Sequence, residues 1–206
     1  MTGASLWLAR HGSTSWSERG RLQGWAPIGL SERGADEATV LARQARELGV
    51  RTVLTSPLRR ARDTAQIVAR AVRAPAIVRP ELRELNYGAL TGCTTHELNA
   101  LAPALAAAWQ RDPWSVRFAR NGGALDDIVA ALGPLLSHSR ASGTPVLWIT
   151  HGHVIRAVMT VQQRLARSEF WSGDVASCKL MNASDWTAAL TARAPQPFSP
   201  GTPSAS

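Results

Sequence analysis

A short apolar run near the start of the chain ends abruptly in polar residues. Residues 5–9 read Ser-Leu-Trp-Leu-Ala, and Arg10, His11 and Gly12 follow them directly. A run of this length and composition predicts a buried strand, and open α/β sheets bind ligands at the carboxyl ends of such strands. Gly12 lets the backbone turn close to a ligand because it has no Cβ. The stretch therefore predicts a sheet edge that carries an imidazole and a guanidinium suited to phosphate.

Strand and helix patterns alternate along the rest of the chain. Short apolar or β-branched runs predict strands, and apolar residues at helical spacing predict helices between them. The order implies an α/β fold, a three-layer α/β/α sandwich with a mostly parallel central sheet. The predicted strands are residues 5–9, 52–55, 76–78, 145–150, 175–181 and 186–190; the predicted helices are residues 32–48, 57–72, 94–110 with a break at Pro103, 125–136 and 154–161.

The signals at the ends of these elements are of two kinds. Ser31 and Ser56 are predicted helix N-caps, the second followed by Pro57 at the first helical position. Residues 12–30 have no clear period and predict a loop, and a loop this long in a compact domain is usually functional. Residues 81–92 have loop composition as well. Gly133-Pro134 predicts a kink in its helix.

Length and composition set the domain organisation. The 206 residues, 45% of them hydrophobic, suit one domain over residues 1–194. Residues 195–206 are rich in Pro, Ser and Thr and predict a disordered tail. Only Cys93 and Cys178 are cysteines, which favours a reducing compartment. No signal peptide or membrane-spanning stretch is recognised, so we expect a cytoplasmic protein without a membrane partner.

The charge of the chain narrows the class of partner. The formal net charge is +8, and Lys179 is the only lysine. Such a balance suits an anionic partner, either nucleic acid or a phosphorylated small molecule. The arginines form no polybasic run and no nucleic-acid motif is recognised. We therefore expect a small phosphorylated substrate and no nucleic acid, and a homodimer is left open.

Polar residues cluster where the predicted strands end. Arg10-His11, Ser56 to Arg60 and His151 each follow a strand, and in a parallel sheet these ends share one edge. Two histidines there indicate phosphoryl transfer through a phosphohistidine, because a neutral imidazole is a competent nucleophile. Nearby arginines would disfavour the protonated ring and bind the phosphoryl oxygens. Glu84, in a loop after the third strand, could give a leaving alcohol its proton.

Six segments of the chain, in order, carry a family resemblance. The sequence resembles the histidine phosphatase superfamily, the phosphoglycerate mutase-like family. Any one segment is a weak signal, but all six in order are specific. They are Leu8-Ala9-Arg10-His11-Gly12-Ser13-Thr14, Gly20-Arg21-Leu22-Gln23-Gly24, Leu30-Ser31-Glu32-Arg33-Gly34, the stretch from Ser56 to Ala65, Leu82-Arg83-Glu84-Leu85-Asn86-Tyr87-Gly88 and Ile149-Thr150-His151-Gly152-His153.

The resemblance implies a phosphoglycerate mutase-like fold and a role for each matched residue. His11 would be the phosphorylated nucleophile and Glu84 the proton donor. The phosphate pocket would consist of Arg10, Arg60 and His151. The implied substrate-binding residues are Ser17, Gln23, Gly24, Arg10 and Arg60. No cofactor and no metal are implied, so we expect metal-independent turnover.

Two segments depart from the family pattern. Ser17 stands where many members have asparagine, and Gly122-Gly123-Ala124-Leu125 replaces a Gly-Glu-Ser segment. Between Gly92 and Gly122 the chain is largely Ala and Leu, with Arg111, Arg117 and Arg120, where the mutases carry an insertion rich in basic residues. This difference favours a phosphatase of the histidine acid phosphatase type over a mutase. The alternatives are mutase-type phosphoryl transfer and a catalytically weak relative that binds phosphorylated ligands.

Several residues allow both a functional and a structural interpretation. His153 is interpreted as a structural residue, with lining of the site as the alternative. Trp16 and Trp25 could bind substrate or pin down their loop. Arg59 and Arg62 are expected on a solvated helix face. A metal site of His96, His138, His151 and His153 is the less favoured alternative, because it lacks an acid or thiol at ligand spacing.

Overall fold

The strands form one mixed sheet at the centre of the molecule. The computed structural model describes residues 5–162, 167–172 and 175–183. The order in the sheet is β3-β2-β4-β1-β5, with β5 antiparallel to β1 and every other pair parallel. This confirms the mostly parallel sheet. The strands are β1 (Leu6–Arg10), β2 (Thr52–Thr55), β3 (Ala76–Val78), β4 (Val146–Thr150) and β5 (Leu180–Asn182).

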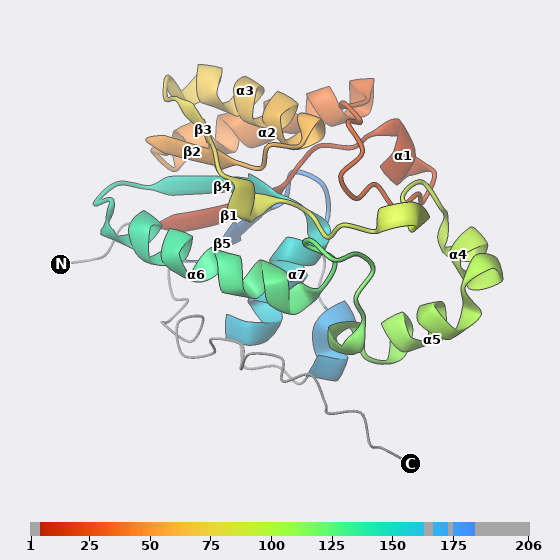
Figure 1. The fold of residues 1–206 in the computed structure, drawn as a ribbon. Coiled ribbons are helices and arrows are strands. Elements are labelled where there is room, and N and C mark those ends of the chain that lie inside the picture. Colours follow the sequence, from red (N-terminus) through yellow and green to blue (C-terminus); the bar gives the residue numbers. More distant parts are fainter. Residues whose placement is uncertain (1–4, 163–166, 173–174, 184–206) are drawn as a thin grey trace, which may run out of the picture.

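Helices cover both faces of this sheet (Figure 1). On one face lie α2 (Glu32–Glu47) and α3 (Arg59–Val72), and on the other lie α6 (Leu125–Ala141) and α7 (Gly152–Gln162). Alternate strand residues feed the two layers, as the pleat requires: Trp148 packs with the α6 side and Leu147 with the α2 side. The three-layer α/β/α sandwich is confirmed.

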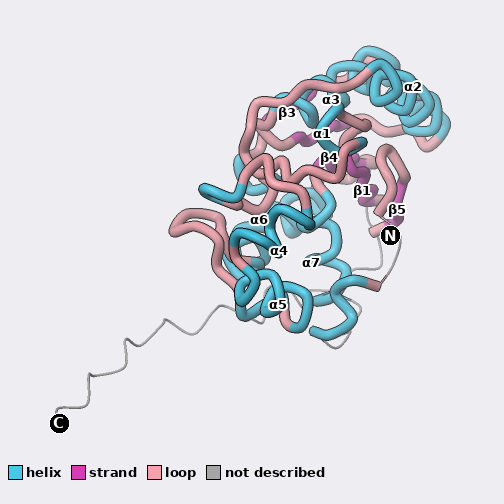
Figure 2. The backbone as a smooth tube through the Cα atoms, turned by 90° about the vertical axis from the view of Figure 1, so that its right-hand side faces the viewer, coloured by secondary structure: helices cyan, strands magenta, loops and turns pink. Residues whose placement is uncertain are grey.

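Shorter helices gather beyond one end of the sheet. These are α1 (Ser15–Glu18), α4 (Thr95–Leu101) and α5 (Pro103–Arg111), and they lie past the end at which β1 and β4 finish (Figures 1 and 2). Pro103 divides α4 from α5, as predicted. The loops also contain the 3-10 turns η1 (Pro80–Leu82), η2 (Gly88–Leu90), η3 (Pro113–Ser115) and η4 (Arg167–Trp171).

The pairing of β1 with β4 sets the position of the functional edge. Arg10 is the register partner of Thr150, so His11 and His151 each follow a paired residue. The His11 amide donates to the Thr150 carbonyl oxygen at 3.0 Å. The Thr150 hydroxyl donates to the Leu82 carbonyl oxygen at 2.9 Å and ties the segment before Glu84 to the same edge. Strand β4 is buried along its whole length.

One of the two predicted N-caps is correct. The Ser31 hydroxyl accepts from the Gly34 amide at 3.1 Å and begins α2. The prediction for Ser56 is wrong: α3 begins at Arg59, with extended Leu58 as an N-cap that makes no side-chain hydrogen bond. Ser56 Oγ instead accepts from the Leu58 amide at 3.2 Å and contacts His151 at 2.8 Å. This turn holds the backbone extended past Pro57 and delays the helix.

The remaining differences concern the extent of elements. Within the predicted loop 12–30, α1 forms one helical turn capped by Thr14. Helix α6 continues through Pro134 to Ala141, because buried leucines on both sides of the proline hold it against the sheet. Of the predicted strand 175–181, only Leu180 and Met181 lie in β5. The predicted strand 186–190 and the tail 195–206 lie outside the described residues. No described helix is long and apolar enough to span a membrane.

The first turn of α2 packs directly against the loop after β1. An added Cβ at Gly34 would overlap the Ser13 carbonyl, and one at Gly12 would overlap the Gly34 carbonyl. Glycine-to-alanine substitutions inside helices normally stabilise. Gly34→Ala should instead destabilise by about 1–3 kcal/mol, the usual range for overpacking. Thermal unfolding measures the sign, and Thr39→Ala on the exposed side of the same helix is the control. A melting temperature that rises in Gly34→Ala would contradict this close packing.

Candidate active site

The His11 imidazole lies at the carboxyl end of β1 and is 2% exposed. Arg60 Nε, which can only donate, lies 3.0 Å from His11 Nε2. This contact assigns the ring proton to Nδ1, which donates to the Gly12 carbonyl oxygen at 2.7 Å. Burial, together with the charges of Arg60 and Arg10, holds the pKa of His11 well below its usual value. The ring is therefore neutral, and its Nε2 lone pair faces Arg60.

Arg60, in the first turn of α3, is a fully buried cation. Its guanidinium donates to the carbonyl oxygens of Gly24 at 2.9 Å and Ala26 at 3.3 Å, besides His11. Desolvation lowers the pKa of Arg60 to about 10, against an opposing effect of the Glu84 charge. The group is still charged at neutral pH, although no carboxylate of the described chain forms an ion pair with it. A buried charge without a counter-ion is costly, and an anion would relieve that cost.

His151 faces His11 across the end of the sheet, with ring centroids 5.1 Å apart. Ser56 Oγ accepts from Leu58 and so can donate its own proton to His151 Nε2, at 2.8 Å. In this assignment Nδ1 carries the ring proton, and within the described residues this buried atom has no partner. Burial and the charge of Arg60 hold the pKa of His151 well below its usual value.

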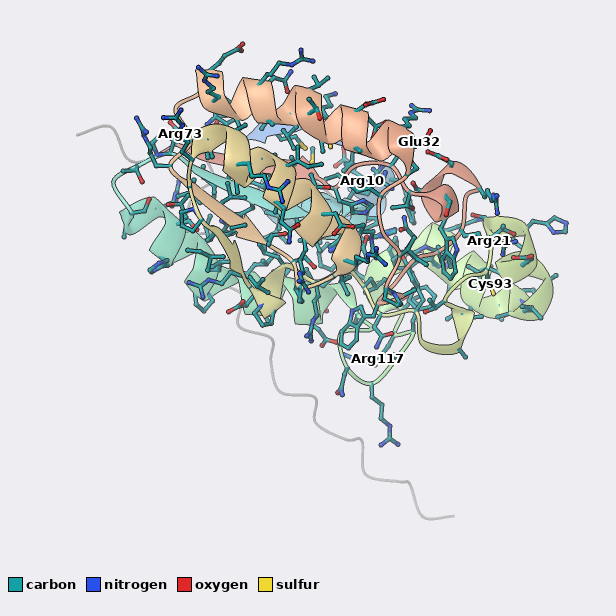
Figure 3. All side chains as sticks on the ribbon, turned by 90° about the horizontal axis from the view of Figure 1, so that it is seen from above. Arg10, Arg21, Glu32, Arg73, Cys93 and Arg117 are labelled. Atoms are coloured by element: carbon teal, nitrogen blue, oxygen red, sulfur yellow. The ribbon has the colours of Figure 1, made fainter. Side chains whose placement is uncertain are left out.

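Arg10 contributes the other buried donor without a partner. Its Nη1 donates to the Val175 carbonyl oxygen at 3.3 Å, while its buried Nε finds no acceptor among the residues described. Seen from above, Arg10 lies near the middle of the molecule, with Arg21 and Arg73 towards opposite ends (Figure 3). Two buried donors that have no partner within the described part of the chain, together with a buried cation and a neutral imidazole, offer the chemistry that an oxyanion needs.

The Glu84 carboxylate lies in the segment after η1 and is 8% exposed. Its Oε1 accepts from the Leu85 amide at 2.9 Å, and its Oε2 lies 3.5 Å from both the amide and the Nδ1 of His153. Burial raises the pKa of Glu84, but the charge and hydrogen bond of His153, the Leu85 amide and the charge of Arg60 together outweigh burial, so the net shift is downward. The side chain is therefore ionised in the resting protein.

The residues of the loop 17–25 differ in how directly they contact the site residues. The Gly24 carbonyl oxygen binds Arg60, and buried Gln23 accepts from the Thr14 hydroxyl at 2.9 Å. The Ser17 hydroxyl bonds to Thr14, and the two residues form the capping box of α1. Trp25 donates from its Nε1 to the Glu84 carbonyl oxygen at 2.8 Å and so helps to hold the segment that carries Glu84. Substrate contacts of Ser17, Gln23 and Gly24 stay predictions.

Supporting residues complete this arrangement, and the sequence reasoning missed them. Thr64 accepts from the Gly12 amide at 3.1 Å and donates to the Arg60 carbonyl oxygen at 2.8 Å, which fixes the loop after β1 to α3. Thr64 lies four residues after Arg60, on the same face of the helix, and this spacing is the sequence signal that could have identified it. Glu37 accepts from the amide and hydroxyl of Ser13 at 2.8 and 2.9 Å. It lies on the opposite helix, and no local pattern marks it.

The stretch from Gly122 to Leu125, which departs from the expected family pattern, lies beside the segment that carries Glu84. The Gly122 carbonyl oxygen accepts from the Asn86 amide at 2.8 Å, and the Gly123 carbonyl oxygen accepts from the Phe118 amide at 2.8 Å. Ala124 and Leu125 are buried. A backbone carbonyl of this stretch thus holds the segment that follows Glu84.

The four-histidine metal site does not form among the described residues. No group of three potential ligands gathers there, and His96 and His138 are exposed on α4 and α6. His153 instead contacts Glu84 and Tyr87. It belongs to the surroundings of the site, so the structural interpretation of this residue is incomplete.

A family comparison covers nearly all of the chain. The model of the histidine phosphatase superfamily, branch 1, matches residues 6–188. Among curated proteins, the probable phosphoglycerate mutase GpmB of Escherichia fergusonii is 40% identical over 85 residues, which are 41% of this chain. The matched stretch spans only 40% of that relative's length.

Solved structures match over most of their length. The mycobacterial glucosyl-3-phosphoglycerate phosphatase Rv2419c, in complex with VO3, is 27% identical with a TM-score of 0.76; the match covers 86% of this chain and 90% of that one. YhfR of Bacillus stearothermophilus is 28% identical with a TM-score of 0.78, covering 86% and 89%.

The buried neutral histidines predict how stability depends on pH. Below about 6.5 the unfolded chain protonates these rings while the folded protein does not. Each of the two histidines should therefore lower the free energy of unfolding by about 1 kcal/mol as the pH falls from 6.5 to 5.5. Denaturant titrations should show a smaller loss over this interval in His151→Asn than in wild type, while exposed His138→Asn serves as control. An unchanged loss in His151→Asn would mean that this ring is charged when folded.

Proposed function

The chain belongs to branch 1 of the histidine phosphatase superfamily, and we propose that it hydrolyses a small phosphomonoester through a phosphohistidine on His11. The observation that carries the proposal is the oxyanion site. Buried Arg60 donates to the neutral imidazole of His11, and the ring of His151 lies 5.1 Å from it. Among the described residues, the buried Nε of Arg10 and Nδ1 of His151 have no hydrogen-bond partner. A phosphoryl group supplies the negative charge and the acceptors that these donors lack.

In the first half-reaction His11 Nε2 attacks phosphorus. In the resting structure this lone pair accepts a hydrogen bond from Arg60 Nε. As the substrate enters, the Arg60 N–H must donate to a phosphoryl oxygen instead. The N–P bond forms while the bond from phosphorus to the ester oxygen breaks. The leaving oxygen keeps the electron pair of that bond and takes a proton from Glu84. Three cationic or donor side chains stabilise the phosphoryl charge, so the proposal needs no metal.

In the second half-reaction water attacks the phosphohistidine. The new O–P bond forms as the N–P bond breaks, and the proton of the water passes to the Glu84 carboxylate. Glu84 thus regains the proton that it gave to the alcohol, and inorganic phosphate leaves. Because Glu84 is ionised at rest, the incoming phosphate dianion must raise its pKa for the first step.

Hydrolysis is favoured over mutase-type transfer by the segment between Gly92 and Gly122. A mutase must bind the carboxylate of its substrate, and this interval offers Arg111, Arg117 and Arg120. Arg117 is already engaged with Asp127 through bonds of 2.7 and 2.9 Å. The partial match to GpmB supports the mutase as second candidate. A catalytically weak phosphoryl-binding protein is the third, and cytoplasmic localisation remains a proposal.

Glu84→Gln should distinguish a proton donor from a structural carboxylate. Alkyl phosphates have poor leaving groups and should lose about 100- to 10,000-fold in kcat/KM, the usual contribution of a general acid. p-Nitrophenyl phosphate needs no proton for its leaving group and should lose less than about tenfold. Glu97→Gln, on exposed α4, is the matched control. Equal losses for both substrates would assign Glu84 a structural role.

Product analysis should separate hydrolysis from transfer. With labelled phosphomonoester, an acid-labile and base-stable label should form on His11 and be absent in His11→Ala. With 3-phosphoglycerate and catalytic bisphosphoglycerate, release of inorganic phosphate should outpace formation of 2-phosphoglycerate, because water reaches the phosphohistidine. Faster interconversion of the phosphoglycerates would establish the mutase. Label on serine or aspartate would overturn the mechanism.

A further inference from the structure

His153, two residues after the catalytic His151, is enclosed by aromatic side chains. Its ring stacks on Phe170 with an interplanar angle of 13° and meets the edges or faces of Trp109, Trp171 and Tyr87, all with centroids within 6.0 Å. These rings come from α5, η4 and the Glu84 segment. Contacts on so many sides fix the orientation of the imidazole.

The polar contacts of the same ring converge on the proton donor. Tyr87 Oη lies 2.9 Å from His153 Nδ1, and Glu84 Oε2 lies 3.5 Å from that nitrogen and 3.5 Å from the His153 amide. Helix α7 begins at Gly152, so this amide lies in its first turn. One residue thus faces Glu84 with a backbone donor and an imidazole nitrogen that donates when it carries a proton.

We propose that His153 is a positioning residue for the general acid–base: it orients the Glu84 carboxylate and, when protonated, stabilises its ionised form, so that it sets the pH range of turnover. The proposal rests on the proposed function and deepens it. Glu84 must be ionised to take the proton of water and protonated to serve the alcohol. A neighbour that stabilises the ionised carboxylate lowers the pH range in which Glu84 meets both requirements.

The electrostatic surroundings support this role. Burial raises the pKa of Glu84, and His153 is the largest of the influences that lower it, ahead of Leu85 and Arg60. The other titratable groups facing the pair are Tyr87 and His151. Burial raises the pKa of Tyr87 well above its usual value, so its phenol stays protonated, and burial keeps His151 neutral. Arg60 also acts on Glu84 through its charge. His153, whose side chain is 20% exposed, is the imidazole that lies within 3.5 Å of the Glu84 carboxylate.

Two substitutions separate orientation from charge. Leucine at this position fits the aromatic surroundings and removes both the imidazole donor and the charge. Asparagine places an amide nitrogen where Nδ1 lies and removes only the charge. His138→Asn, on the exposed surface of α6, is the matched control.

The pH dependence of kcat/KM is measured for an alkyl phosphate and for p-nitrophenyl phosphate. His153→Leu should lower kcat/KM for the alkyl phosphate roughly tenfold at the wild-type optimum, part of what a general acid contributes, and change the p-nitrophenyl value less than about twofold. His153→Asn should recover most of this loss. In both variants the alkaline limb of the alkyl phosphate profile should move to higher pH. Ionisation of the substrate cancels in the comparison.

A titration of the free protein tests the same contact without turnover. The carboxyl carbon of Glu84, followed by NMR, should titrate at higher pH in His153→Leu and His153→Asn than in wild type or His138→Asn. Equal losses for both substrates with an unmoved alkaline limb, or an unmoved Glu84 titration, would overturn the role of His153. Absence of hydrolysis in the wild type would overturn the proposed function, while the NMR titration would still decide whether His153 acts on Glu84.

Discussion

The parallel pairing of β1 with β4 is the contact on which the candidate site depends. It matches Arg10 with Thr150, and the next residue of each strand is a histidine. A shift of one residue would turn alternate side chains to the opposite face of the sheet and separate the two imidazoles. The same edge holds the Glu84 segment through the bond from Thr150 to Leu82. Hydrogen bonds therefore place His11, His151 and the Glu84 segment together at one edge of the sheet.

Burial decides how these groups behave. Arg60 is fully buried against carbonyl oxygens and one neutral imidazole. A buried cation lowers the stability of the free protein, and it attracts an anion strongly. Both effects grow as water is excluded. Burial, together with the charges of Arg60 and Arg10, keeps His11 unprotonated. The buried charge of Arg60 thus lowers the stability of this edge of the sheet and favours an anion there.

Glu84 has a second set of contacts, on the α7 side of the sheet. It receives donors from Leu85 and from the first turn of α7, and aromatic rings from α5 and η4 hold His153 beside it. Burial is the largest influence on the pKa of both His11 and Glu84. Arg60 and Arg10 lower the pKa of His11 further, whereas His153 is the largest of the influences that lower the pKa of Glu84.

Local patterns in the sequence determined much of this protein. Apolar runs predicted β1 to β4, helical spacing predicted the main helices, and motif order pointed to His11, Arg60, Glu84 and His151 as candidate site residues, because these signals lie within a few adjacent residues. Tertiary structure decided the rest. Ser56 contacts His151 instead of capping α3. Thr64 and Glu37 hold the loop after β1, and His153 lies beside Glu84. Each of these contacts links residues far apart in the chain, and its energy exists only once the sheet and helices have brought them together.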